Sequence, residues 1–380
     1  MSTLRFVYTK SVKPRLFFVP YYIHWFVLKT ISFFVCSKSN NKYLKNNTKL
    51  LISAGVRGWE SIEFKELLRS ANEYLGKPDK VIQHRLEDNR NYISDVRYLI
   101  REHGITHFFY DPRTGDQTIF GGFLESVRLS ILCTRNDVTP IVFFTDMSFR
   151  RWRIKGALMS AISGIAICFV TPRLAHPILP HKRLFGPSLM PFSLETLNWI
   201  QKGGEGDSLV KDKNAAYFIG SLYEPRTTIL NNVKKGLNEK KVDLVILGRQ
   251  LGATRKPDSV YWKTMIDAPI IFTTSDQLLS PQFDWTWIPN LVYRYLEAIS
   301  SGALLIAPVV PCIERYFEPG VHFIPFYSQD DAIQKIEYYL VHHDERKKIA
   351  DEGMRKARAL VESKIFWLHI DSCLSSKSLL

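Results

Sequence analysis

The stretch Ile288–Pro308, IPNLVYRYLEAISSGALLIAP, places a carboxylate in apolar surroundings. Glu297 stands between Leu296 and Ala298, just before a run that is typical of a buried strand. Burying an unpaired carboxylate is costly, so Glu297 needs either a partner or a function. Residues three apart are neighbours on a helix, so Glu297 can pair with Arg294 on a solvated face. That pairing is the structural alternative to a functional role.

The spacing around Glu297 predicts a helix from Leu291 to Ser300, followed by a buried strand over Ala303–Ala307. Asn290 is a suitable N-cap for this helix, since its side chain can accept a hydrogen bond from a free backbone amide. Gly302 is well placed for a left-handed cap at the other end.

A second candidate site is the turn Gly220-Ser221-Leu222-Tyr223-Glu224-Pro225-Arg226, between the predicted strand Ala216–Ile219 and a helix. A glycine at a strand end permits close backbone approach, and a helix N-terminus attracts anions. Arg226 is unfavourable beside the positive end of the helix dipole, and a bound phosphate would remove that conflict. The alternative is an ordinary loop with a solvated arginine.

The first half of the chain offers weaker candidates. The loop Gly55-Val56-Arg57-Gly58 directly follows the first predicted strand, and by itself a short glycine loop is weak evidence of a site. Asp111 and Asp146 each end a predicted strand, where their side chains would project toward a cleft or, as single residues, serve as helix caps or turn formers. The sequence contains neither GxGxxG nor GxxxxGK[ST].

No paired DxD carboxylates are present to hold a metal–diphosphate complex. We therefore expect no metal and no cofactor, with any bound diphosphate neutralised by arginine, lysine and helix dipoles.

Strands alternate with helices along the chain, which predicts an α/β fold with parallel sheets. At 380 residues the chain fits two domains. We predict two Rossmann-like domains facing a central cleft, with ligands at the carboxyl ends of the strands. The predicted divisions are an N-terminal aromatic and basic segment over 1–47, a first Rossmann-like domain over 48–200, a linker over 201–213, a second Rossmann-like domain over 214–362 and a tail over 363–380.

The composition is globular, and its charge favours anionic partners. Lys and Arg number 51 against 37 Asp and Glu, a formal net charge of +14. The five cysteines are scattered without CxxC spacing, which favours a reducing, cytoplasmic location. Leu16–Cys36 is apolar and aromatic with basic residues on both sides, and three interpretations stay open: a peripheral membrane segment, which we favour, a membrane anchor, or a strand and helix packed on the domain.

From Ile288 to about Ala359 the chain resembles the C-terminal half of a family-4-like (group 1) glycosyltransferase of the GT-B fold. The resemblance lies in RYLEAISSGALLIAP, in IERYFEPGVHFIPF and in DDAIQKIEYYLVHHDERKKIADEG. The turn GSLYEPR, which ends at Arg226, is similar to the first turn of that family's nucleotide-binding domain.

The resemblance implies an enzyme that transfers a sugar, expected to be a hexose, from a nucleoside diphosphate sugar to an acceptor hydroxyl. It implies that Glu297 accepts hydrogen bonds from the ribose hydroxyls and that Arg226 binds phosphate. The implied nucleotide-sugar set is Gly220, Ser221, Arg226, Asn290, Arg294 and Glu297. The family has an earlier glutamate where this chain has Pro289.

The implied mechanism is retaining, with Arg226 stabilising the leaving phosphates. If the enzyme inverts, Asp146 or Asp111 becomes the base.

The resemblance implies that the domain over 48–200 binds the acceptor, with Gly55, Arg57 and Gly58 in an acceptor-side loop, and that the domain over 214–362 binds the nucleotide sugar. The expected acceptor is a lipid-linked or surface polysaccharide at the inner face of the membrane, with peripheral membrane contact. Nucleic acid is the less favoured acceptor, and a nucleotide-sugar epimerase or a non-catalytic binding protein are alternatives from other classes.

Overall fold

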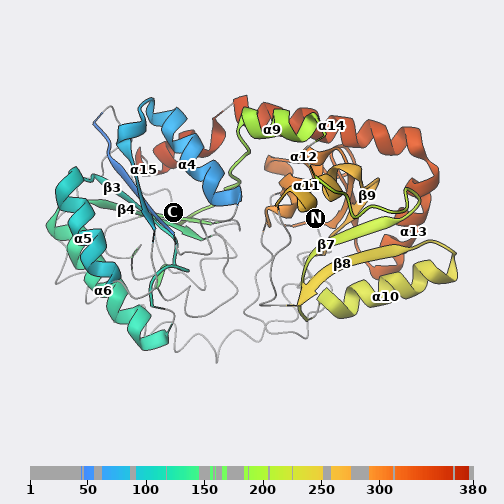
Figure 1. The fold of residues 1–380 in the computed structure, drawn as a ribbon, viewed down its shortest axis with the longest axis horizontal. Helices are drawn as coiled ribbons and strands as arrows, with labels where there is room; N and C mark the ends of the chain where they lie inside the picture. Colours follow the sequence, from blue (N-terminus) through green and yellow to red (C-terminus); the bar gives the residue numbers. More distant parts are fainter. Residues whose placement is uncertain are drawn as a thin grey trace. The chain divides into compact units, whose positions relative to one another are not determined.

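The computed structural model divides the chain into two units (Figure 1). One unit comprises Met1–Met190 with Lys364–Leu380, and the other comprises Pro191–Ser363. The structure describes residues 44, 47–54, 62–85, 91–116, 118–144, 155–156, 159, 165–168, 184–186, 188–203, 206–224, 226–250, 258–274, 291–310, 313–362 and 364–375.

The first unit is built on a parallel sheet of six strands in the order β2-β1-β3-β4-β5-β6. Its central strands β3 and β4 are buried at every residue, as expected when helices cover both faces of a parallel sheet. The strands are β1 (Leu50–Ala54), β2 (Val81–Arg85), β3 (His107–Tyr110), β4 (Thr139–Phe144), β5 (Ile165–Cys168) and β6 (Leu184–Phe185).

Two helices of the first unit begin at polar caps. Asn91 accepts a hydrogen bond from Ser94 N at the start of α5, and Thr118 accepts one from Gly121 N at the start of α6. The C-cap of α5 is Gly104, whose φ of 59° lies in the left-handed region that glycine favours. The described helices are α4 (Ile62–Leu75), α5 (Tyr92–His103), α6 (Ile119–Arg135), α15 (Ile365–Ser375) and the short η1 (Pro78–Lys80).

The second unit has a parallel sheet of five strands in the order β11-β10-β9-β7-β8. Its strands are β7 (Ala216–Leu222), β8 (Leu244–Gln250), β9 (Ile270–Phe272), β10 (Leu304–Pro308) and β11 (Ile324–Phe326). Its helices are α9 (Leu194–Gln201), α10 (Arg226–Glu239), α11 (Asp258–Asp267), α12 (Arg294–Ser301), α13 (Gln329–Val341), α14 (His343–Glu362) and the short η3 (Ile313–Arg315).

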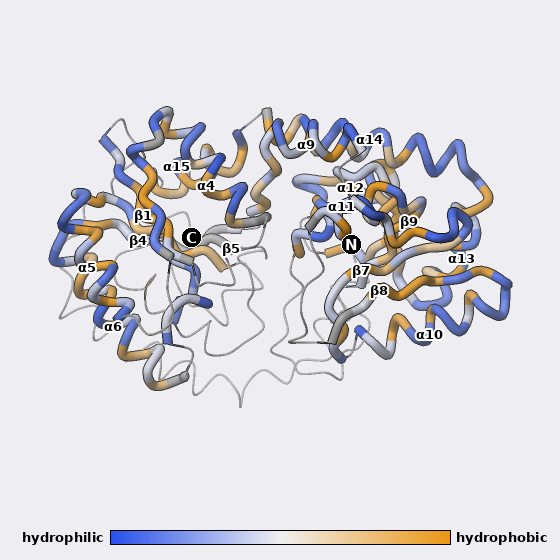
Figure 2. The backbone as a smooth tube through the Cα atoms, in the orientation of Figure 1, coloured by the Kyte–Doolittle hydropathy of each residue, from blue (hydrophilic) through white to orange (hydrophobic). Residues whose placement is uncertain are grey.

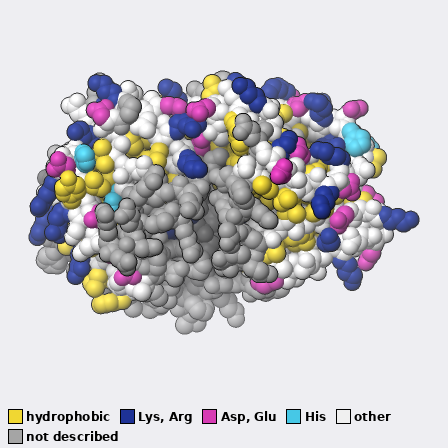
Figure 3. Space-filling model, in the orientation of Figure 1, with side chains coloured by type: hydrophobic (Ala, Val, Ile, Leu, Met, Phe, Trp, Pro, Cys, Tyr) yellow, Lys and Arg dark blue, Asp and Glu magenta, His cyan; other side chains and the backbone are white. Residues whose placement is uncertain are grey.

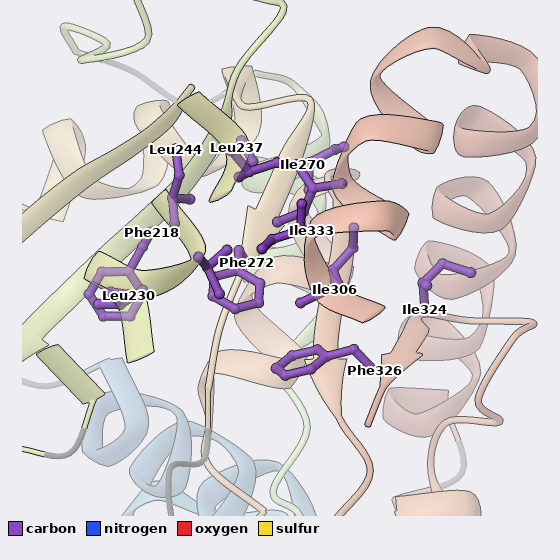
Figure 4. Close-up of a cluster of buried hydrophobic side chains, with 14 of the residues drawn as sticks. Phe218, Leu230, Leu237, Leu244, Ile270, Phe272, Ile306, Ile324, Phe326 and Ile333 are labelled. Atoms are coloured by element: carbon purple, nitrogen blue, oxygen red, sulfur yellow. The ribbon is translucent and has the colours of Figure 1, made fainter. Parts of the chain in front are cut away.

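The core of the second unit lies where α10 and α13 pack on one face of this sheet (Figure 4). Phe218, Phe272 and Ile306 of the strands meet Leu230 of α10 and Ile333 of α13. Helices that pack on a sheet place polar residues outward, and Figure 2 shows α14 as largely hydrophilic beside the hydrophobic strands. Strands β7 and β9, whose carboxyl ends form the candidate site, are both part of this core.

Both sheets reverse their strand order at the same point. The second strand of each unit pairs on one side of the first, and the third strand pairs on the other side, at β1/β3 and at β7/β9. This is the doubly wound Rossmann-like order, and ligands bind at the carboxyl ends of the strands beside such a switch point. The predicted α/β class with two Rossmann-like domains is confirmed.

The boundaries of the units differ from the predicted ones. The sequence predicts that the linker follows helix α9, but α9 belongs to the second unit, where it packs against α12 and α14. The predicted tail after Glu362 forms α15 of the first unit, because Phe366 and Trp367 bury their rings beside Phe143 and Phe109. Both differences come from packing between residues distant in sequence.

The N-terminal segment over 1–47 lies outside the described residues apart from Leu44 and Asn47. In the described part of the chain, no helix combines the length and the apolar character needed to cross a bilayer.

We predict that Trp367→Ala destabilises the first unit by about 3–5 kcal/mol, the usual cost of removing a buried aromatic side chain. Trp367 is 2% exposed and donates from Nε1 to Ser70 Oγ at 2.9 Å. The neighbouring Leu368→Ala is the control, because Leu368 is 53% exposed. Urea unfolding, followed by hydrogen exchange in β3 and β4, measures the stability of both variants. Equal stability of the two variants would contradict the packing of α15.

Candidate functional site

The candidate site gathers at the carboxyl ends of β7 and β9, the switch point of the second sheet. Arg226, the first residue of α10, lies across both strands. Its Nη1 donates to the carbonyl oxygen of Ser221 at 3.1 Å, and its Nη2 donates to that of Thr274, just after β9, at 3.4 Å. The ring of Tyr223 lies 4.3 Å from the guanidinium carbon. A cation is therefore held in a fixed orientation where the fold class binds ligands.

Gly220 makes room for a second cation at the same strand end. A side chain at this position would place Cβ 3.0 Å from Nη1 of Arg294 and 3.2 Å from its Nη2. Gly220 has a φ of 158°, which residues with side chains rarely adopt. The guanidinium of Arg294 thus lies directly over the backbone of β7.

Glu297 is buried, with 7% of its surface exposed. Its Oε2 atom accepts hydrogen bonds from the Tyr261 hydroxyl at 2.7 Å and from Arg294 Nε at 3.0 Å. The Oε1 atom accepts no hydrogen bond from a described residue. One oxygen of the carboxylate is therefore fixed by two donors, and the other is left for a different hydrogen-bond donor.

The alternative interpretation of Glu297, an ion pair with Arg294 on a solvated face, is correct only for the ion pair. The ion pair with Arg294 exists, at 3.0 Å, but it does not lie on a solvated face. All residues of α12 from Tyr295 to Ser301 are buried. Burial lowers the pKa of Arg294, but Tyr261 and the Glu297 carboxylate raise it, and the net effect is a raised pKa that keeps the guanidinium charged.

The helix that carries Glu297 begins later than predicted. Helix α12 starts at Arg294, and its N-cap Tyr293 makes no side-chain capping bond. Asn290 is therefore not its N-cap, and Asn290 lies outside the described residues. The cap at the other end is confirmed, since Gly302 has a φ of 80°.

Two helices thus begin at arginines beside one glycine. Arg226 opens α10 and Arg294 opens α12, and each helix N-terminus already favours negative charge. Both guanidinium groups lie near Phe218. The guanidinium carbon of Arg226 is 5.7 Å from the centre of the Phe218 ring, and the Cζ atom of Phe218 is 3.3 Å from where a Cβ atom at Gly220 would lie. This arrangement attracts an anion to the end of β7.

Tyr261 is the site residue that sequence patterns missed. It lies on α11, and its ring also faces the guanidinium of Arg294 at 5.6 Å. The neighbouring Trp262 anchors α11 by packing edge-on against Phe192 and Trp199. No short motif links Tyr261 to Glu297, because they are 36 residues apart in sequence and meet only through packing.

In the first unit, Asp111 serves the turn that follows β3. It is 2% exposed, and Arg113 donates to it from the backbone amide at 2.8 Å and from Nη2 at 2.7 Å. Both carboxylate oxygens accept from Arg113. Of the two sequence interpretations, this geometry supports the turn former. Asp146, Gly55, Arg57 and Gly58 lie outside the described residues.

The loop after Asp111 is held by a buried lysine. Lys155 is 1% exposed, and its Nζ donates to the carbonyl oxygens of Thr114 and of Asp116, the latter at 2.8 Å. Glu125 Oε1 lies 3.3 Å from the same nitrogen. Burial raises the pKa of Glu125 and lowers the pKa of Lys155, while their attraction opposes both shifts. This cluster fixes the loop.

Within the described part of the chain, no group of three or more His, Cys, Asp or Glu side chains is placed to hold a metal ion.

Comparison with known proteins matches a segment that contains part of the candidate site. Residues 261–364 match the model of a family described as glycosyl transferase-like, a segment that begins at Tyr261 and contains Arg294 and Glu297. No curated protein sequence gives a significant match.

Solved structures show the same fold at low sequence identity. The Anabaena protein HepE, in complex with UDP and glucose, superposes with a TM-score of 0.58 at 10% identity, covering 87% of this chain and 100% of its own. Sucrose-phosphate synthase from Thermosynechococcus elongatus gives 0.55 at 8% identity, covering 86% and 98%. A Rickettsia africae glycosyltransferase gives 0.53 at 10% identity, covering 88% and 100%.

The two Rossmann-like units have the GT-B fold, and the second unit contains a glycosyl transferase-like segment. The matched segment, residues 261–364, lies within the part of the chain whose sequence resembles group 1 glycosyltransferases, and the structural matches show that the chain shares their fold.

We predict that Glu297→Ala lowers the stability of the second unit by about 1.5–3 kcal/mol, the range for hydrogen bonds to charged groups. The variant leaves the Arg294 guanidinium and the Tyr261 hydroxyl without their shared acceptor. Urea unfolding with hydrogen exchange in α11 and α12 provides the measurement.

The control for this variant is Glu337→Ala, which removes an exposed carboxylate paired with Lys240. Exposed ion pairs contribute little, so its stability should change by less than about 1 kcal/mol. Equal losses in the two variants would mean that the bonds to Glu297 Oε2 do not stabilise the site.

Proposed function

We propose that this enzyme transfers a hexose from a UDP-sugar to a hydroxyl of a lipid-linked or surface polysaccharide acceptor, with retention of configuration. The observation that carries the donor part is the fixed carboxylate of Glu297, which keeps one oxygen for a new partner beside two arginines. HepE, which shares the fold, was solved with UDP and glucose and with UDP-glucose, so UDP is the nucleotide to test first.

Glu297 is proposed to recognise the nucleoside. Its Oε1 would accept a hydrogen bond from a ribose hydroxyl, while Arg294 and Tyr261 orient the carboxylate through Oε2. A charged acceptor that is already positioned loses little side-chain entropy when the nucleotide binds.

The two arginines and the strand end are proposed to hold the diphosphate. Arg226, Arg294 and the helix N-termini would neutralise its charge, and the backbone of Gly220 and Ser221 allows close approach. As the sugar leaves, negative charge grows on the leaving phosphate, and preorganised cations stabilise that charge most strongly in the transition state. Donors of this kind would make a metal ion unnecessary.

The acceptor is proposed to bind the first unit at the cytoplasmic face of a membrane. The net charge of +14 and the basic, aromatic segment before residue 47 support an acidic surface as the place of action. Because Asp111 is engaged by Arg113, a retaining course that needs no strong protein base fits this chain best. Asp146 stays the candidate base for an inverting course.

We predict that UDP raises the melting temperature, and that Glu297→Ala weakens UDP binding at least about tenfold. A ligand at a hundred times its dissociation constant stabilises by about 2.7 kcal/mol, enough to move the melting temperature by a few degrees. Thermal unfolding against UDP, GDP, ADP and CMP gives the donor class. Glu337→Ala serves as control, and a UDP shift that survives unchanged in Glu297→Ala would refute the nucleoside role.

We also predict that Arg226→Ala slows sugar transfer about a hundredfold, because it removes a cation from the leaving phosphates. Arg355→Ala is the matched control, since Arg355 is 70% exposed on α14. The readout is release of UDP from UDP-hexoses with and without an acceptor fraction. Release without acceptor dependence points to hydrolysis, and sugar interconversion without release would instead support an epimerase.

A further inference from the structure

Helix α6 of the first unit is apolar on both of its sides. Its inner side packs on the sheet through buried residues that include Leu129, Leu132 and Cys133. A helix on the surface of a soluble domain normally turns charged and polar residues outward. In α6 the outer side departs from that pattern.

The outer side of α6 carries a continuous stripe of apolar and basic residues. Phe120 is 73% exposed and Leu124 is 37% exposed, one helical turn apart. The stripe, at helical spacing, consists of Phe120, Leu124, Val127, Arg128, Ile131 and Arg135, each exposed or half-buried. We call these six residues the α6 stripe.

The α6 stripe contains no acidic residue. The one acid of α6 is Glu125, which is 8% exposed and faces Lys155 inside the unit. Arg128 and Arg135 are both exposed, so the stripe has a net positive charge beside its apolar residues.

Helix α5 extends this surface. It contacts α6, and Figure 1 draws the two helices side by side. Arg97, Tyr98 and Arg101 of α5 are exposed, Tyr98 at 62%, together with the acid Glu102. Figure 3 shows hydrophobic and basic side chains together at the end of the molecule where Figure 1 places these helices.

We propose that the α6 stripe docks the enzyme on an anionic lipid surface. Phe120 and Leu124 would enter the boundary between headgroups and acyl chains, and Arg128 and Arg135 would contact lipid phosphates. The proposal deepens the acceptor part of the proposed function, because a lipid-linked acceptor is presented at such a surface. It does not involve the residues that bind the donor.

Charge favours lipid over a second copy of the chain. A symmetric dimer through the α6 stripe would bring Arg128 and Arg135 of one copy against the same residues of the other, with no acid in the stripe to pair with them. An anionic bilayer offers both the negative charge and the apolar depth that the stripe matches.

Flotation of the full-length protein with vesicles tests the proposal. Phosphatidylcholine vesicles mixed with phosphatidylglycerol should bind the protein, and phosphatidylcholine alone should bind it at least about tenfold less. Two stripe variants, Phe120→Ser with Leu124→Ser and Arg128→Glu with Arg135→Glu, should each reduce binding to the anionic vesicles at least about tenfold.

Matched controls separate the stripe from general charge and from folding. Lys347→Glu with Arg355→Glu changes the net charge equally on α14, where the two side chains are 75% and 70% exposed, and should leave binding unchanged. Val341→Ser, at a 70% exposed position of α13, is the control for the apolar variant. The UDP melting shift should survive in every variant.

Unchanged vesicle binding in both stripe variants would overturn the proposal and point to another lipid-binding segment, such as residues before 44. Equal binding to neutral and anionic vesicles would overturn the role of Arg128 and Arg135. A stripe-dependent dimer that binds no vesicles would assign the stripe to a second copy of the chain. None of these outcomes bears on donor binding, which the UDP shift measures separately.

Discussion

The shared hydrogen bonding at Oε2 of Glu297 is the interaction on which the site depends. A carboxylate that is 7% exposed would be unstable without strong donors, and Arg294 and Tyr261 supply two of them to the same oxygen. Because both donors converge on one atom, the carboxylate is oriented and its other oxygen can accept a further hydrogen bond. Its stability and its proposed recognition of a nucleoside therefore have the same physical origin.

The strand order brings those donors together. Reversal at β7/β9 leaves the carboxyl ends of two neighbouring strands free of crossing connections, and Arg226 spans them through two carbonyl oxygens. Gly220 then lets Arg294 approach the same strand end from α12. Cations at two helix N-termini are unfavourable by themselves, which is the physical reason to expect an anionic ligand here.

The first unit shows how the same strand order serves different purposes. At its corresponding strand ends the described polar groups stabilise loops. Asp111 accepts hydrogen bonds from Arg113, and Lys155 donates to carbonyl oxygens of the loop that follows. Its outward features are instead the apolar and basic residues of α6. Donor binding is thus the role proposed for the second unit, and contact with a surface is the role proposed for the first.

The sequence by itself determined the alternation of strands and helices, the glycines at residues 220 and 302, and Arg226, Arg294 and Glu297 as candidates. These features are local: burial periodicity, backbone freedom at glycine and helical spacing act over a few residues. Only the tertiary structure decided that Tyr261 completes the Glu297 site, that α12 begins at Arg294, and that α15 packs on the first unit. Those outcomes rest on contacts between segments far apart in the chain, whose energies no local pattern encodes.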